Sequence, residues 1–206
     1  MDTRTDSAPL IVMSASPAQV RDLAPVDEAS RELARHTVEL VDRLGVGGRP
    51  IELVASRDER WRTGHAGSFR AWGATQVRVG QGHHLPELVA RHVLGGREIT
   101  SVRSRIGEIN PKALTLVAAD GSAGMTDRAP LALLDGAGDA HRALLGLLAG
   151  SGLSLTGAEL ADAGVIEPQP WLELAALPVR HASVEYHDTH LGVGRYLAAW
   201  CVGPAQ

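Results

Sequence analysis

Short apolar runs alternate with an amphipathic segment at the start of the chain. Short, mainly apolar stretches of the length expected for buried strands lie at residues 10–13, 51–55 and 113–119. Between the first two, apolar residues recur every three or four positions over 29–44, and charged residues occupy the other face. This spacing predicts an amphipathic helix that begins after Asp27 and ends at Gly45. Strand, helix and strand in this order predict a parallel crossover unit.

The middle of the chain is less regular. Residues 57–75 form a long polar connection without a hydrophobic period, which is typical of functional or mobile loops. Beyond it, the pattern predicts a strand at 76–79 and a helix at 85–94 with proline in its first turn. Residues 98–103 are expected to form an edge strand.

The last third of the chain predicts mainly helices. Residues 140–149, 157–163 and 170–177 are separated by turns that contain Gly and Pro, and strands are expected at 182–187 and 194–202. Together these elements predict one α/β domain over residues 8–203. Its central sheet should be mostly parallel or mixed, with helices on both faces. The first seven residues are expected to be disordered.

Composition narrows the class of protein. The 206 residues are enough for one domain with its own core, and the longest apolar runs are far shorter than the roughly 20 residues of a membrane helix. The net charge of −4, with acids and bases interspersed, lacks the basic patch of nucleic-acid or membrane binders. We therefore expect neither as a partner. The lone Cys201 and a start without a signal-peptide pattern predict a cytoplasmic location.

Candidate chemistry begins where the run 113–119 ends, at Asp120-Gly-Ser122. Ligands of α/β sheets bind at the carboxyl edge of the strands, so Asp120 and Ser122 are candidates to orient a polar ligand or to act in catalysis. The alternative is that Asp120 accepts backbone N–H groups of its own turn. A nucleophilic role for Ser122 lacks the Gly-x-Ser-x-Gly pattern and an assignable base.

Two histidines near the C-terminus are weak candidates for a metal site. His187-Asp-Thr-His190 offers two imidazoles and a carboxylate within four residues, and Zn and Ni bind such groups. The alternative is that His187 and His190 are ordinary turn residues, because nine histidines in the chain produce such pairs by chance.

Several other residues are candidates to line a ligand pocket at the same sheet edge: His65, His83, His84 and Trp72. Trp61 also lies in the long polar connection and shares with Trp72 a candidate role in ligand or subunit contact. Trp171 and Trp200 lie in apolar segments and are expected to supply bulk to the core.

Several short motifs follow one another in a characteristic order. They are Asp120-Gly-Ser122 after an apolar strand, Ala129-Pro130, Ala163-Gly164, Pro170-Trp171 and Gly192-Val-Gly-Arg-Tyr-Leu-Ala198, with Gly67-Ser-Phe-Arg-Ala-Trp-Gly73 and Val79-Gly-Gln-Gly-His-His-Leu-Pro86 upstream. This order resembles the class III extradiol ring-cleavage dioxygenase (LigB-like) superfamily, and more closely an actinobacterial branch of it. The resemblance covers nearly the whole chain and implies an α/β fold.

The resemblance also implies where an active site would lie. Active members cleave catechol rings with O2 on Fe(II) held by two His and one carboxylate, and a further His acts as acid and base. The positions that match these roles are Ser14-Ala-Ser-Pro17, Ser56 with Arg57, Val165 and Ala123. None is an imidazole or a carboxylate, so the resemblance implies a relative without the metal site. Of the family's site, only Asp120 and Ser122 remain.

Two functions follow as alternatives. The favoured one is a bacterial pseudoenzyme without a cofactor, which binds a small molecule at the carboxyl edge of the sheet or another protein; self-association through the edge strand stays open. The other is an active enzyme. It would be either an extradiol-type dioxygenase with Fe(II) on relocated ligands, or a metal-free hydrolase or transferase that uses Asp120 and Ser122. The enzyme alternative predicts a deep polar cleft beside Asp120.

Overall fold

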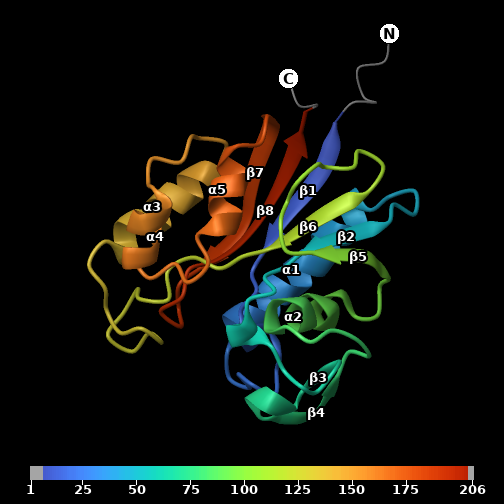
Figure 1. Ribbon diagram of the computed structural model, residues 1–206, viewed down its shortest axis with the longest axis horizontal. Helices are drawn as coiled ribbons and strands as arrows, with labels where there is room; N and C mark the ends of the chain where they lie inside the picture. Colours follow the sequence, from blue (N-terminus) through green and yellow to red (C-terminus); the bar gives the residue numbers. More distant parts are fainter. Residues whose placement is uncertain (1–6, 204–206) are drawn as a thin grey trace.

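Six strands form the central sheet of the computed structural model, which describes residues 7–203 (Figure 1). Their order across the sheet is β5-β2-β6-β1-β8-β7. Their bounds are β1 Ala8–Met13, β2 Ile51–Val54, β5 Ile99–Arg103, β6 Leu114–Ala118, β7 Val179–Asp188 and β8 Arg195–Val202. Strands β5, β2, β6 and β1 run parallel, whereas β8 is antiparallel to both β1 and β7. The sheet is therefore mixed, and β6 lies between β1 and β2.

Helices pack on both faces of this sheet (Figure 1). Helices α1 (Glu28–Leu44) and α2 (Leu85–Leu94) pack on one face. Helices α3 (Ala137–Leu148), α4 (Gly157–Asp162) and α5 (Gln169–Ala175) pack on the other. The predicted single α/β domain with a mixed sheet and helices is thus confirmed.

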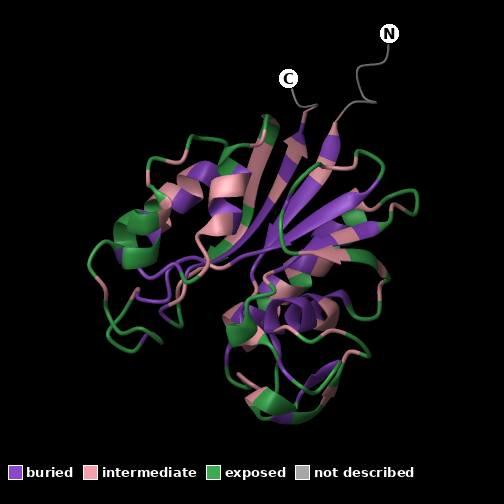
Figure 2. Ribbon diagram, in the orientation of Figure 1, coloured by how far each residue is buried: buried purple, intermediate pink, exposed green. Residues whose placement is uncertain are grey.

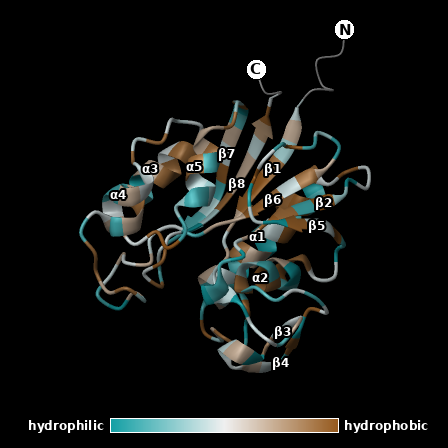
Figure 3. Ribbon diagram, in the orientation of Figure 1, coloured by the Kyte–Doolittle hydropathy of each residue, from teal (hydrophilic) through white to brown (hydrophobic). Residues whose placement is uncertain are grey.

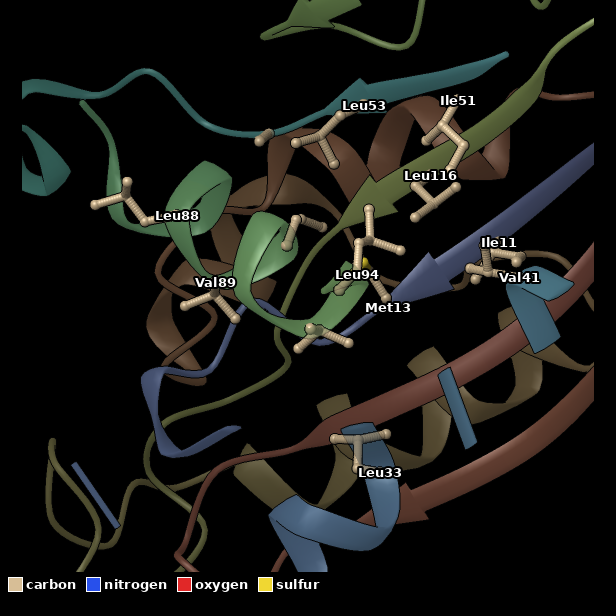
Figure 4. Close-up of a cluster of buried hydrophobic side chains, with 14 of the residues drawn as sticks. Ile11, Met13, Leu33, Val41, Ile51, Leu53, Leu88, Val89, Leu94 and Leu116 are labelled. Atoms are coloured by element: carbon tan, nitrogen blue, oxygen red, sulfur yellow. The ribbon is translucent and has the colours of Figure 1, made fainter. Parts of the chain in front are cut away.

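The central strands are buried because both of their faces are covered (Figure 2). In β1, Ile11 and Met13 face the cluster formed with α1 and α2, whereas Leu10 and Val12 face the helices of the other side. Figure 4 shows the first cluster, where α2 side chains such as Leu94 meet those of the sheet. Figure 3 shows the hydrophobic residues concentrated in these strands and in the inner faces of the helices. This double coverage explains why β1 and β6 appear in the sequence as mainly apolar runs, with Thr115 the one polar residue of β6.

Asp27 occupies the position before α1, as predicted, but its side chain does not cap the helix. Its Oδ2 instead accepts a hydrogen bond at 2.8 Å from Arg195, which is fully buried on β8. Arg195 also donates to Ser30 and Asp188. Burial raises the pKa of Asp27, but hydrogen bonds from Ser30 and Arg195 outweigh it and lower the pKa overall. This buried network ties the start of α1 to β8.

The long polar connection 57–75 is more ordered than its pattern indicates. It contains the short helices η2 (Glu59–Trp61) and η3 (Arg70–Trp72) and the strand β3 (Ser68–Phe69). Strand β3 pairs with β4 (Ala74–Arg78) in a separate two-stranded sheet, so the strand predicted at 76–79 lies outside the central sheet. Elements of two or three residues are too short to show a hydrophobic period, which is why the sequence did not indicate them.

The remaining predicted helices and strands are present, with ends shifted by a few residues. A short helix, η1 (Pro17–Gln19), follows β1. The predicted disordered segment 1–7 lies outside the described residues, except for Ser7. Among residues 7–203, no helix combines the length and apolarity that a membrane crossing requires.

Candidate functional site

A pocket of about 380 Å³ lies at the carboxyl ends of β1, β2 and β6. We call it the carboxyl-edge pocket. Its lining residues are Ala15, Ser16, Pro17, Ala18, Ser56, Trp61, Leu85, Pro86, Ala118, Ala119, Asp120, Gly121, Ala123, Pro130, Ile166, Glu167, Pro170, Leu191 and Val193. Parallel strands end at one edge, so loops that are far apart in the sequence converge there. Most of the lining side chains are apolar.

Asp120 is one of two carboxylates in this pocket. Its Oδ1 accepts hydrogen bonds from the Ser14 hydroxyl and, at 3.1 Å, from the Ala15 N–H, both in the loop that follows β1. The other oxygen, Oδ2, receives no hydrogen bond from the residues that the structure describes. The bonds to Asp120 therefore come from the loop after the neighbouring strand rather than from the turn of Asp120 itself. They hold one oxygen and leave the second for a ligand.

Burial changes the acidity of Asp120. The residue is partly exposed to the pocket, but its carboxylate is enclosed by protein, and this burial raises its pKa to about 6. Hydrogen bonds from Ser14 and Ala15, the charge of Arg195 and the nearby Ser16 N–H act in the opposite direction without cancelling the effect. A carboxyl group with such a pKa changes its protonation state close to neutral pH.

Glu167, in the connection between α4 and α5, is the second carboxylate of the pocket. Its Oε1 accepts hydrogen bonds from the Ser56 hydroxyl at 2.9 Å and from the Trp61 indole Nε1 at 2.8 Å. Within the described part of the chain, nothing donates a hydrogen bond to Oε2. Glu167 thus repeats the arrangement of Asp120, with one oxygen fixed and the other without a protein partner.

Ser122 does not line the pocket. It is fully buried, and its hydroxyl donates to the Ala163 carbonyl at 2.6 Å and accepts from the Gly124 N–H at 3.0 Å. Residue 122 also forms an isolated β-bridge with Val165. These contacts give Ser122 a structural role, joining the loop after β6 to the end of α4.

An aromatic pair, the buried Tyr196 and the half-buried His141, lies behind the Asp120 turn. The Tyr196 hydroxyl and His141 Nδ1 share a hydrogen bond of 2.8 Å, and the rings stack with centroids 5.5 Å apart. Burial and the negative charge of Asp120 raise the pKa of Tyr196, so the phenol keeps its proton. Burial and the charges of His187 and Arg142 lower the pKa of His141. The pair is therefore neutral at neutral pH and supports the turn from behind.

The other pocket candidates lie elsewhere. None of His65, His83, His84 and Trp72 lines the carboxyl-edge pocket. His65 and His83 are exposed, and His84 occupies the position before α2, next to the lining residue Leu85. Trp72 packs edge-on against Phe69, with ring centroids 6.4 Å apart. Of the two tryptophans in the polar connection, Trp61 is the one that reaches the pocket.

His187 and His190 are both exposed, on β7 and in the turn after it. The ring of His187 lies near that of His141, at 6.0 Å between centroids, while the His190 N–H bonds to Asp188. Over residues 7–203, no three His, Cys, Asp or Glu side chains are grouped so that they could hold a metal ion. The two histidines therefore do not converge with other ligands.

Glu167 is the site residue that sequence reasoning missed. It stands in Ile166-Glu-Pro168, between two short helices, and no strand end marks it. The one available signal was an acid inside an otherwise apolar, Pro-rich connection.

The chain was also compared with known proteins. No protein-family model matches it, and a search of curated proteins finds no significant match.

Proposed function

We propose that this protein binds a small, largely apolar molecule in the carboxyl-edge pocket, as a non-catalytic relative of the class III extradiol ring-cleavage dioxygenases. The observation that carries the proposal is the pocket itself, which stays open beside Asp120 rather than being filled by side chains. A pocket of this kind, with apolar walls and a few polar groups that fix orientation, is the usual form of a small-molecule site.

The residues of the pocket do not fit the family's iron. Fe(II) in these enzymes needs two imidazoles and a carboxylate on one face. Among the described lining residues there is no histidine, and the matching positions carry Ser56 and the loop 14–17 instead. The two carboxylates are each bound to neighbouring donors through one oxygen. This donor set supports a binding role without the family's metal chemistry.

A pocket-filling variant tests the proposal. Ala18, which lines the pocket, is changed to Trp, and Ala176, which is exposed outside it, receives the same change as a matched control. A library of small apolar molecules is screened by thermal shift against the three proteins. Compounds that raise the melting temperature of the wild type and of Ala176→Trp, but not of Ala18→Trp, support the proposal. Equal shifts in all three proteins contradict it.

Metal analysis provides a second test. The protein is purified anaerobically, loaded with Fe(II), and its metal content is measured. We expect well under one iron per chain and no cleavage of catechol. Nearly one iron per chain, together with ring cleavage, would contradict the proposal and favour a dioxygenase with relocated ligands.

One observation favours a second candidate function, an enzyme that uses Asp120 as a general acid or base. Its pKa of about 6 suits proton transfer close to neutral pH. If a molecule that binds the pocket is converted, the rate should follow an apparent pKa near 6 and be lost in Asp120→Asn. Conversion that persists in this variant would exclude the role.

A further inference from the structure

The two carboxylates of the carboxyl-edge pocket share an unusual feature. Asp120 and Glu167 come from different loops, yet each has one oxygen held by protein donors and one without a protein donor in the described chain. Both residues line the same pocket. Two hydrogen-bond acceptors are thus available to a ligand inside apolar walls.

No positive charge balances them from within the pocket, because its described lining contains no Arg, Lys or His. The two cations whose charges act on these carboxylates, Arg195 and Arg60, are each paired with other acids. Arg195 acts on Asp120 from β8, where it already binds Asp27 and Asp188. Arg60 interacts with Glu167 from the surface and is paired with Asp58 at 3.0 Å. The inside of the pocket is therefore acidic.

From this arrangement we infer that the ligand of the carboxyl-edge pocket is an organic cation, an amine whose ammonium group is held by Asp120 and Glu167 and whose apolar body fills the pocket. The inference rests on the proposed small-molecule function. An ammonium group brings only donors, which match two free acceptors, and its charge offsets theirs. A carboxylate or phosphate ligand would meet like charge in a poorly screened environment and would be rejected.

Three probes of similar size separate the alternatives: phenethylamine, the neutral 2-phenylethanol and the anion phenylacetate. Binding to the full chain is measured at pH 8 by calorimetry, with quenching of tryptophan fluorescence as a second readout because Trp61 lines the pocket. We expect the amine to bind at least about tenfold more tightly than the alcohol, the gain typical of a charge-assisted hydrogen bond. We expect no binding of phenylacetate.

Isosteric variants assign the effect to the carboxylates. Asp120→Asn and Glu167→Gln should each weaken amine binding about tenfold and leave the affinity for the alcohol within about twofold. Glu167 is partly exposed, and we expect Glu167→Gln to keep the fold because its amide oxygen can still accept the bonds from Ser56 and Trp61, so the test does not depend on the buried Asp120 variant alone. A change of Glu159 to Gln, on the exposed surface of α4, is the control and should alter neither affinity.

The outcomes distinguish the inference from the proposed function. If amine and alcohol bind equally, or phenylacetate binds best, and Ala18→Trp abolishes that binding, the pocket function stands and the cation inference is overturned. If the wild type binds the amine more tightly than the alcohol but neither carboxylate variant changes the affinity for the amine, the inference is also overturned. If none of the probes binds, the cation inference fails, and the library screen with Ala18→Trp decides the proposed function separately.

Discussion

The Trp171 indole Nε1 donates a hydrogen bond at 3.0 Å to the main-chain carbonyl of Asp120. Trp171 lies on α5 and is fully buried, so this bond fixes the turn after β6 to a helix on one face of the sheet. The same turn is held from the β1 side through the Asp120 carboxylate. Asp120 is thus positioned by both its main chain and its side chain.

Trp171→Phe should lower the free energy of unfolding by about 2–4 kcal/mol, because it leaves the Asp120 carbonyl without its donor and a void in the core. Urea denaturation measures the change. Trp72→Phe is the control: Trp72 is partly exposed, and no hydrogen bond of its indole is found in residues 7–203, so the loss should stay below about 1 kcal/mol. Similar losses in both variants would contradict the role given to the Trp171 bond.

Gly121 should not tolerate a side chain, because a Cβ there would lie 2.5 Å from the Tyr196 hydroxyl oxygen. Gly121→Ala is expected to lower the free energy of unfolding by about 1–3 kcal/mol through overpacking. Gly152→Ala is the matched control, since a Cβ at residue 152 would meet nothing within 4 Å. Equal melting temperatures for the two variants would contradict the prediction, because they would mean that the turn accommodates a Cβ at residue 121 without loss of stability.

Asp120 should make the protein less stable as the pH rises from 4 to 8. Its pKa is about 6 in the folded chain because the carboxyl is buried, and close to 4 when unfolded. Below pH 4 the Asp120 carboxyl is protonated in both the folded and the unfolded protein, so it does not change the stability. Above pH 6 the folded protein holds a buried carboxylate charge, which destabilises it. The charged groups that face Asp120 are Arg195 and, across the pocket, Glu167, with Tyr196 protonated behind it.

The stability of Asp120→Asn relative to wild type should therefore increase between pH 4 and 8, by about 2–3 kcal/mol. Urea denaturation at several pH values measures this difference. Glu52→Gln supplies a control of opposite sign. Burial raises the pKa of Glu52, but hydrogen bonds from Arg103 and Asn110 lower it overall, so this variant should lose relative stability as the pH rises. The same trend in both variants would contradict the assigned shifts.

The ion pair between Asp27 and Arg195 should contribute far more to the free energy of unfolding than an exposed ion pair on the surface of α1. Asp27→Asn leaves the buried Arg195 with Asp188 as its one carboxylate partner among residues 7–203, which should cost about 2–4 kcal/mol in unfolding free energy. Glu39→Gln breaks the exposed pair with Arg35 and should cost less than about 0.5 kcal/mol. Thermal denaturation of the two variants compares them. A larger loss of stability in Glu39→Gln than in Asp27→Asn would contradict this prediction.

The sequence predicted the fold in some detail because the strands and long helices carry clear periods. Helix α2 begins and ends where its proline and glycine indicated, and β5 is at the edge of the sheet as expected. The position of β6 between β1 and β2 could not be read from chain order, because parallel strands need not be neighbours in sequence.

The site was predicted only in part. Asp120 could be identified because it ends a buried strand, and such ends converge on one edge. Glu167 could not, because it reaches the pocket from a connection whose path depends on how α4 and α5 pack. In the sequence, Asp120 and Ser122 look equally suited to line a site at the strand end. The structure distinguishes them, because the Ser122 hydroxyl is bonded to the Ala163 carbonyl and the Gly124 N–H and does not reach the pocket.

The antiparallel pairing of β8 with β1 also determines when the sheet can be completed during protein synthesis. Strand β1 is made before the other five strands of the sheet, whereas β8 (residues 195–202), one of its two neighbours, is made after all of them. The turn before β8 supplies Leu191 and Val193 to the carboxyl-edge pocket. A nascent chain that lacks these residues has an incomplete pocket and an unpaired strand edge. A ligand can therefore bind the complete pocket only after Leu191 and Val193 have been synthesised.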